Sequence, residues 1–510
     1  MDTTTRPETA VRTDPHPAVP GLLAAVHLVD VAAPGMEGLA LWLAEAGADV
    51  TGSIPEAARN SPVVAALEAA GVRVHVGFDA GHVRTDRTAV VWSGVVAGAH
   101  PELDRAQVLR LPILGRAVAL KAISVQAGAG AAVAVAGSHS TATAAAALAH
   151  ILDDGQTGWA LTAPARDGAP GHAGDGGRVV VDLCPDAGTH EAAPPGAWQH
   201  RPAPHFLTTE PKFAAALILA TSTNAPHFED NIAGLNAAER IARNAGVVVL
   251  PTWDTSVANL RERLGDRPVR GQRVVTVGTD PASTVWIMAP RWTGEDFRVL
   301  LRYQEKDHAF VLPVAGRHHA LAVCAAIATA LVLGEDPQAV AERAASFRGV
   351  ERSLATVGVQ RGVTVVDSRA RHPREVAQDV EAARMLTEGS LLVVLETDGL
   401  ARTSAHAAEL GAALEGVDHA LLLPVGTPLV HHAVPDPLDA VEQAARRNLG
   451  GGKVQRARSG PCEPGPEQAI GELAAEGDLV LVVGTGQSER LGARLLFHLA
   501  APGAPIPQHL

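Results

Sequence analysis

The chain has 510 residues, of which 47% are hydrophobic and 19% charged, and its formal net charge is -13. This balance is typical of a globular protein and excludes a wholly disordered chain. The negative charge argues against a general affinity for nucleic acid or for anionic membranes. No apolar run approaches the about 18 residues that a membrane span requires. The length predicts about three domains.

The start of the chain and its cysteines bear on location. Residues 1–20 are polar and rich in proline, and they lack the apolar core of a signal peptide, so we expect a disordered tail. The three cysteines, Cys184, Cys324 and Cys462, are far apart and form no CxxC pair. They therefore predict neither a disulfide framework nor a zinc site, and a cytoplasmic location is expected.

Short apolar runs alternate with amphipathic helical patterns along the chain, which predicts an α/β fold with parallel sheets. The first domain, residues 21–127, is expected to be Rossmann-like, with strands at Ala25–Val31, Val72–Val76 and Ala89–Trp92 and a helix at Met36–Ala48. The second, residues 128–354, contains a loop-rich stretch over residues 163–205. Its expected elements are strands at Val133–Ala136, Val179–Leu183, Ala214–Ala220 and Val247–Pro251 and helices at Ala320–Leu333 and Pro337–Phe347.

The third domain, residues 355–510, repeats the alternation of strand and helix and is also expected to be Rossmann-like. Its expected strands are Thr364–Val366, Leu391–Leu395, His419–Leu423 and Leu479–Val483.

The most informative segment joins an apolar strand to an alanine-rich helix through Gly137-Ser138-His139-Ser140-Thr141-Ala142. A tight turn of small residues before a helix is typical of a phosphate-binding loop, in which backbone N–H groups hold an anion. A working loop of this kind has a lysine for the phosphates and a hydroxyl for Mg²⁺, where this chain has Thr141 and Ala142. The segment also fits an ordinary strand-to-helix turn that Ser138 or Ser140 caps.

An ordered series of segments resembles the Mur ligase family of peptidoglycan synthesis. The matching segments are residues 27–40, Thr51-Gly52-Ser53, residues 90–94, His100-Pro101-Glu102-Leu103, residues 134–139, Gly316-Arg317-His318, residues 347–352, residues 366–375, Arg402-Thr403, residues 477–481 and Gly484-Thr485-Gly486. The resemblance implies three domains, the central one a P-loop-type ATPase domain, and an ATP- and Mg²⁺-dependent reaction that joins a carboxylate to an amine. It supports fold and ancestry more strongly than activity.

Several positions depart from the family pattern. Ser140-Thr141-Ala142 stands where the family has Gly-Lys-Thr, and the metal-binding glutamate of the family falls near Cys184. Of the family element around Ser222–His227, only the histidine remains, and Ala322 replaces an adenine-contacting asparagine. In the first domain Asp30 takes a glycine position, where its carboxylate would repel a diphosphate.

The resemblance implies roles for a few retained side chains. The candidate catalytic residues are His227, His372 and Glu375, and the candidate substrate-binding residues are Arg352 and Arg402, since arginine binds carboxylates bidentately. Each also has a structural interpretation: a loop-packed histidine, a helix start at His372-Pro373 followed by Glu375, and ordinary surface arginines.

No metal site is predicted, because Asp182, Asp186, His139 and His227 lack the spacing of one. Losing one preorganised donor costs on the order of 10²–10³ in rate. We therefore expect a catalytically degenerate homologue without a cofactor, which binds a small molecule or an enzyme of the same pathway.

Two alternatives stay open. In the first, the chain is a diverged ligase that uses ATP and Mg²⁺, with Arg317, Lys306 or Arg371 replacing the lysine. In the second, it is a new kind of enzyme that uses the old cleft without ATP.

Overall fold

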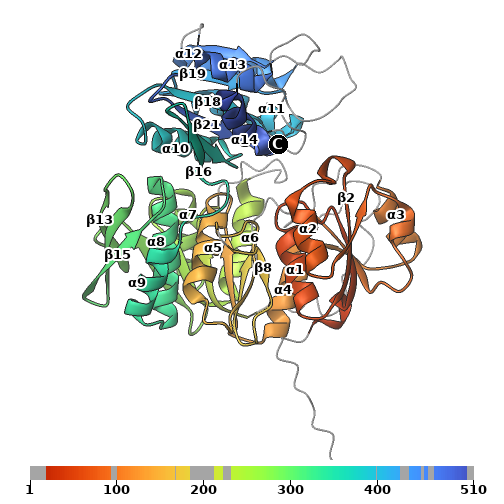
Figure 1. Cartoon of the computed structure of the whole chain (residues 1–510). Helices are drawn as coiled ribbons and strands as arrows, with labels where there is room; N and C mark the ends of the chain where they lie inside the picture. The colour runs from red at the N-terminus through yellow and green to blue at the C-terminus, as the bar shows by residue number, and fades with distance from the viewer. Residues whose placement is uncertain are drawn as a thin grey trace, which may run out of the picture.

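Three α/β domains follow one another along the chain in the computed structural model (Figure 1). The structure describes residues 19–93, 100–166, 168–183, 212–221, 231–397, 399–424, 436–449, 453–457, 465–486 and 488–501. The predicted fold class is confirmed. The expected tail lies almost wholly outside these residues, and the domain boundaries after residues 127 and 354 stay predictions. No helix in the described ranges is both long enough and apolar enough to cross a membrane.

The N-terminal domain is a parallel five-stranded sheet in the order β3-β2-β1-β4-β5. Its strands are β1 (Ala25–Val29), β2 (Asp49–Ile54), β3 (Arg73–Val76), β4 (Ala89–Trp92) and β5 (Ile113–Gly115). Its helices are α1 (Met36–Glu45), α2 (Pro62–Ala69), α3 (Pro101–Val108) and α4 (Arg116–Ala127), with the short 3-10 helices η1 (Gly21–Leu23), η2 (Glu56–Ala58) and η3 (Ala80–His82). The first strand ends two residues earlier than expected because Asp30 is left-handed (φ 57°) and turns the chain.

The central domain has a ten-stranded sheet in the order β15-β14-β13-β12-β11-β10-β6-β9-β7-β8. Its strands are β6 (Ala132–Ala136), β7 (Gly158–Ala160), β8 (Gly171–His172), β9 (Val179–Asp182), β10 (Phe213–Ile218), β11 (Ala245–Pro251), β12 (Arg273–Gly278), β13 (Val285–Trp292), β14 (Phe297–Tyr303) and β15 (Lys306–Leu312). Its helices are α5 (Thr141–Leu152), α6 (Asn231–Arg243), α7 (Ser256–Asp266), α8 (Arg317–Leu333) and α9 (Pro337–Ser346). The antiparallel strands β13, β14 and β15 were not expected from the sequence.

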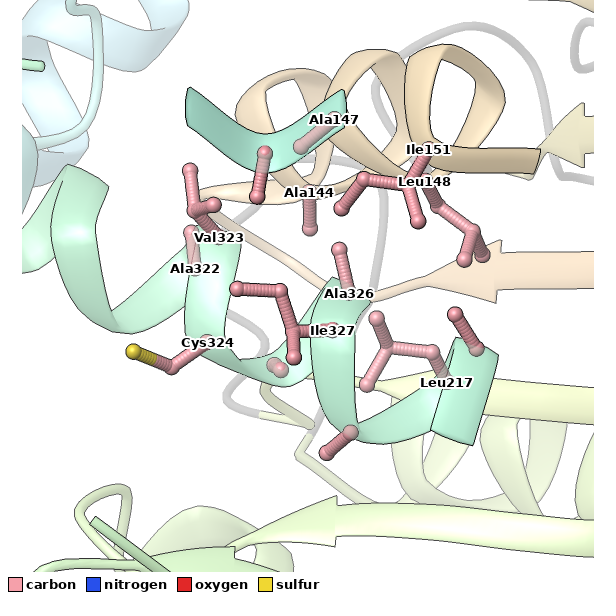
Figure 2. Packing of buried hydrophobic residues seen from close by; sticks show 14 of the residues in the cluster. Ala144, Ala147, Leu148, Ile151, Leu217, Ala322, Val323, Cys324, Ala326 and Ile327 are labelled. Atoms are coloured by element: carbon pink, nitrogen blue, oxygen red, sulfur yellow. The ribbon is translucent and has the colours of Figure 1, made fainter. Parts of the chain in front are cut away.

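Helices α5 and α8 form the centre of this domain's core. In Figure 2, Ala144 and Leu148 of α5 lie opposite Ala326 of α8. The small alanine side chains let the two helices approach closely, and both helices are apolar on nearly every side because protein surrounds them. Cys324 of α8 is fully buried and unpaired. This packing fixes where both helices begin, and those two starts face the site described below.

The C-terminal domain has a six-stranded sheet in the order β16-β17-β21-β18-β19-β20. Its strands are β16 (Ala355–Gln360), β17 (Val363–Ser368), β18 (Leu391–Leu395), β19 (His419–Leu422), β20 (Val454–Arg456) and β21 (Leu479–Val483). Its helices are α10 (Pro373–Arg384), α11 (Leu400–Ala412), α12 (Pro437–Leu449), α13 (Pro466–Leu473) and α14 (Ser488–Ala500). In Figure 1 this domain lies above the central one, with α10 on the side of α8, and the two helices are in contact.

Candidate functional site

The predicted phosphate-type loop connects β6 to α5 at the carboxyl edge of the central sheet. Gly137 has φ 152°, and a Cβ atom at this position would lie 3.0 Å from the backbone nitrogen of Ala220 on the neighbouring chain segment. Glycine is therefore required here for two reasons, the conformation and the close approach. Ser140 is left-handed (φ 60°) and is the N-cap of α5, but its side chain makes no capping hydrogen bond. The strand, turn and helix are those predicted.

The start of α5 carries no positive side chain. Thr141 is its first residue and is 3% exposed, and Ala142 follows it. Neither contributes a charge where a phosphate group would lie. What remains to attract an anion at this end of the helix is the set of unpaired backbone N–H groups and the helix dipole.

One of these backbone N–H groups donates a hydrogen bond to a carboxylate of the protein itself. The backbone nitrogen of Ser140 donates to Oε1 of Glu375 over 3.0 Å, and Glu375 belongs to α10 of the C-terminal domain. His372 is the N-cap of α10 and accepts from the backbone nitrogen of Arg374 over 3.2 Å, with Pro373 in the first helical turn. The helix start expected at this motif is therefore present, and Glu375 joins two domains from it.

His139 of the loop lies beside a buried acid. Its Nε2 is 3.1 Å from Oδ2 of Asp254, which follows β11 and has a side chain only 1% exposed. The backbone and hydroxyl of Ser256 donate to Oδ1 of Asp254 over 2.9 and 2.6 Å. From α10, Nη1 of Arg374 donates to Oδ2 over 2.8 Å. Asp254 thus links the loop to the C-terminal domain.

These contacts set the protonation of Asp254. Burial raises the pKa of its carboxyl group, but the hydrogen bonds from His139 and Ser256 and the charges of His139 and Arg374 outweigh burial. The pKa lies well below its ordinary value as a result. Asp254 is therefore a carboxylate across the physiological range, in an environment that favours negative charge.

Little space is left between the loop and α10. The cavity there measures about 20 Å³ and is lined in part by His139, Ser140, Trp253, His318 and Arg374. A volume of this size holds about one water molecule. Pockets for organic ligands usually measure about 300–1,000 Å³. In this conformation the described residues between the loop and α10 leave no room for a nucleotide.

Among the described residues, Arg374 is a basic side chain beside the loop, and the sequence analysis did not single it out. Lys306, one of the expected substitutes, lies on β15, six strands from β6 and so about 29 Å away at a strand spacing of about 4.8 Å. Arg317 is exposed at the start of α8, and Arg371 lies just before α10. The signal that could have found Arg374 is its place directly after His372-Pro373, inside the segment 366–375 that resembles the family.

Arg352 already binds a carboxylate of the chain itself. Its Nε and Nη2 donate to Oδ2 and Oδ1 of Asp367 over 2.7 and 3.0 Å, and Nη2 also donates to the carbonyl oxygen of Gly484. The bidentate geometry expected for a substrate carboxylate is thus used on Asp367 of the chain itself. Arg402 lies in α11, and its side chain is outside the described part of the chain. Their substrate-binding roles stay predictions.

The other candidates are only partly described. His227, Cys184 and Asp186 lie outside the described residues, so the catalytic role of His227 stays a prediction. Asp182 ends β9, is fully buried, and its Oδ2 accepts from the backbone nitrogen of Thr162 over 3.2 Å.

The turn after β1 in the N-terminal domain has a different electrostatic character. Its first residue, Asp30, is partly buried, and burial together with the negative charge of Glu102 raises its pKa to about 6. Glu102 is fully buried and accepts hydrogen bonds from Ser53 over 2.6 Å and from His82 over 2.8 Å. A second negative group is therefore disfavoured at this turn, as expected from the sequence for a diphosphate.

Known proteins with similar sequences agree with the resemblance. Residues 25–127 match the family described as "Mur ligase family, catalytic domain", and residues 352–486 match "Mur ligase, glutamate ligase domain". The UDP-N-acetylmuramate–L-alanine ligase of Streptomyces griseus subsp. griseus is 30% identical over 502 residues, which cover 95% of this chain and 99% of that protein. The ligase of the same name from Thermobifida fusca is 30% identical over 492 residues, covering 93% and 96%.

A solved structure matches the fold. The crystal structure of UDP-N-acetylmuramate–alanine ligase from Thermotoga maritima superposes with a TM-score of 0.71 at 21% identity, covering 93% of this chain and 98% of that one. The correspondence extends over all three domains, since hardly any of either chain is left out.

Proposed function

We propose that this chain, which belongs to the Mur ligase family, is a non-catalytic member that acts by binding, either in regulation or in holding a small-molecule ligand. Its relatives are named for joining UDP-N-acetylmuramate to L-alanine. A precursor of that chemical class, or an enzyme of peptidoglycan synthesis, is the partner that this ancestry suggests. A cytoplasmic location is part of the proposal.

The observation that carries the proposal is the state of the loop after β6. Phosphoryl transfer depends on a lysine and Mg²⁺ that neutralise the transferred group. Thr141 and Ala142 supply neither a charge nor the expected metal-binding hydroxyl. The loop amide of Ser140 is bonded to Glu375, whose carboxylate would face an incoming phosphate.

These residues do not fit Mg·ATP. The cavity of about 20 Å³ is more than tenfold smaller than a usual ligand pocket. Opening it would separate Arg374 from Asp254 and Glu375 from Ser140, so nucleotide binding would have to replace both contacts. We therefore expect ATP binding to be too weak to support turnover.

The test measures thermal shifts of the full chain with Mg·ATP and with a non-hydrolysable analogue. Because a ligand that binds the native state must raise its apparent stability, no shift at millimolar nucleotide supports the proposal. The Thermobifida fusca ligase serves as the positive control. A nucleotide-dependent shift in this chain, together with release of phosphate when UDP-N-acetylmuramate and L-alanine are added, would refute the non-catalytic assignment.

Variants that restore the family residues separate the effect of the two loop positions from that of Glu375. The double change Thr141→Lys and Ala142→Thr restores the family residues, and Glu375→Ala removes the carboxylate from the loop. If the loop chemistry and Glu375 both block the nucleotide, the triple variant binds Mg·ATP more tightly than the double variant. The single Glu375→Ala variant separates the effect of the carboxylate from that of the two loop positions.

One observation favours a second candidate, an active and diverged ATP-dependent ligase that forms an amide bond. Arg374 is a basic side chain of another domain that lines the same small cavity as His139 and Ser140 of the loop, as a substitute for lysine would have to do. If this candidate is right, the chain hydrolyses ATP in the presence of substrates and Arg374→Gln removes that activity. If the non-catalytic proposal is right, the parent chain and Arg374→Gln are equally inactive.

A further inference from the structure

Three potential metal ligands meet where α8 of the central domain contacts α10 of the C-terminal domain. His318 and His319 are in the first turn of α8, and Asp379 is in the middle of α10. One ligand atom from each lies within 4.8 Å of the other two, and Nε2 of His318 is 2.9 Å from Oδ1 of Asp379. The side chains of His318 and Asp379 are 9% and 4% exposed. No such combination was apparent from the spacing along the chain.

A second contact orients the imidazole of His319. Its Nδ1 lies 2.9 Å from the carbonyl oxygen of Ala315. A carbonyl oxygen can only accept a hydrogen bond, so Nδ1 carries the proton and Nε2 keeps its lone pair. A histidine that binds a metal through one nitrogen usually donates from the other to a carbonyl or carboxylate in this way.

Asp379 is oriented in the same manner. Its Oδ2 accepts a hydrogen bond from the hydroxyl group of Ser368, and that hydroxyl oxygen accepts from the backbone nitrogen of Ala370 over 3.0 Å. Its Oδ1 is buried and makes no hydrogen bond of suitable geometry, although His318 lies close to it. The carboxylate therefore presents one buried oxygen, without a hydrogen-bond donor of its own, toward the two imidazoles.

The protonation states suit a cation. Burial, with a smaller contribution from the charge of His318, lowers the pKa of His319 to about 3, so this imidazole is neutral at physiological pH. Burial raises the pKa of Asp379, but the proximity of His318 and the hydrogen bond from Ser368 outweigh burial and lower it, so the carboxyl group is ionised. The guanidinium of Arg166 also acts on His319, as the weakest of the influences on it. A neutral imidazole and a carboxylate are the forms that coordinate divalent metals.

We propose that His318, His319 and Asp379 bind one divalent transition-metal ion of the Zn²⁺ type, which joins the central domain to the C-terminal domain. Two nitrogen ligands and one oxygen ligand suit Zn²⁺ better than Mg²⁺, which prefers oxygen. Tetrahedral Zn²⁺ with bonds of about 2.0–2.2 Å places its ligand atoms about 3.3–3.6 Å apart. Nε2 of His318 and Oδ1 of Asp379 are 2.9 Å apart, and no pair of the three ligand atoms is more than 4.8 Å apart, so side-chain movements of about 1 Å bring them to this spacing. The adjoining cavity of about 20 Å³, which His318 also lines, has room for a water as the fourth ligand.

The experiment uses the full chain without a histidine tag, stripped of metal by a chelator and then titrated with Zn²⁺ and with Co²⁺. We expect about one ion per chain, visible absorption of the type given by tetrahedral Co²⁺, and a higher melting temperature with Zn²⁺. His319→Gln and Asp379→Asn should each weaken binding by more than the about 10–100-fold that loss of an outer partner costs. Ser368→Ala should fall within that 10–100-fold range.

The matched control is His150→Gln, a partly buried histidine of α5 whose Nε2 pairs with the hydroxyl of Ser346. It should leave the affinity unchanged. The proposal fails if the parent chain binds no Zn²⁺, or if His319→Gln and Asp379→Asn bind as tightly as the parent. Either result would leave His318 and Asp379 as a buried ion pair between two helices.

A measurement on the parent chain covers the case in which these variants do not fold. X-ray absorption of the Zn²⁺-loaded protein should show two imidazoles and a shell of nitrogen and oxygen atoms at about 2.0–2.2 Å. A shell without imidazole, or one with three or more imidazoles, would place the ion elsewhere and overturn the proposal.

Discussion

The turn after β1 and the turn after β6 each join a buried strand to a helix, and each contains a residue in the left-handed conformation, Asp30 in the first and Ser140 in the second. At the first turn the pKa of Asp30 is raised to about 6 by burial and by Glu102. At the second, Asp254 keeps a pKa below its ordinary value. The same backbone architecture therefore disfavours a negative charge in one domain and favours it in the other.

The difference teaches that backbone geometry alone does not make an anion site. What decides is the balance between buried acids and the cations or N–H groups around them. The loop after β6 has Thr141 at the family's lysine position and Arg374 nearby, and its negative charges come from Asp254 and Glu375 of the same chain.

The largest loss of unfolding free energy is expected from Asp254→Asn. This change leaves His139 and Arg374 near the loop without their buried carboxylate, and breaking such a pair from one side costs about 3 kcal/mol of unfolding free energy. Urea unfolding at neutral pH measures it. Since the folded pKa of Asp254 is below the unfolded value of about 3.9, the contribution is present above that pH and is lost as the pH falls. The gap between parent and variant should shrink toward pH 3.

A surface pair provides the control for this variant. Asp307 forms a bidentate ion pair with Arg302 on the exposed face of the strands β14 and β15. Asp307→Asn should cost less than about 1 kcal/mol, as exposed ion pairs do. If Asp254→Asn lowers the unfolding free energy by no more than Asp307→Asn does, the loop after β6 does not favour negative charge. The proposed difference between the two turns would then be wrong.

A smaller change in unfolding free energy, a gain instead of a loss, is expected from Asp30→Asn. The folded pKa is about 6 against an ordinary value of 3.8, so the parent loses stability as the pH rises through this window. Asparagine carries no charge and tolerates the left-handed conformation. The variant should gain about 1–2 kcal/mol at pH 8, a value reduced from the full shift because Asp30 is partly exposed, and nothing near pH 4. Melting temperatures at both pH values measure this, with the exposed Asp104→Asn as control.

The smallest effect on stability is expected from Glu375→Ala, which removes one hydrogen bond and should cost about 0.5–1.5 kcal/mol. The freed amide of Ser140 at the start of α5 should then accept an inorganic anion. Phosphate at millimolar concentration should raise the melting temperature of this variant more than that of the parent. Glu381→Ala, an exposed position on the same helix, should show no such response. Equal responses in all three proteins would mean that Glu375 does not compete with anions.

Local features of the site were predictable from the sequence. The apolar run ending at Ala136, the small residues after it and the alanine-rich segment up to Leu152 predicted the strand, turn and helix correctly. The helix start at Pro373 was also predicted, because proline and an acid suit the first turn of a helix. The alternation in Phe297–Tyr303, buried and exposed in turn, contained the signal for the strand β14 that was missed.

Contacts between domains were not predictable in this way. Arg374 and Asp254 are 120 residues apart, and they meet only because α10 is placed over the loop by the docking of two domains. The approach of Asp379 to His318 and His319 depends on the same docking. Periodicity and turn chemistry describe single elements, whereas such pairs depend on the rigid-body placement of whole sheets.

The hydrogen bond from Ser140 to Glu375 spans 235 residues of chain. At synthesis rates of about 5–20 residues per second, about 12–47 s pass between the emergence of the two residues from the ribosome. Because domains generally fold as units from the N-terminus, the central domain can fold once α8 and α9 have emerged, and the folded loop then presents the uncapped amide of Ser140 until Glu375 docks. Any anion or chaperone that meets the nascent protein encounters a loop that the finished molecule no longer presents.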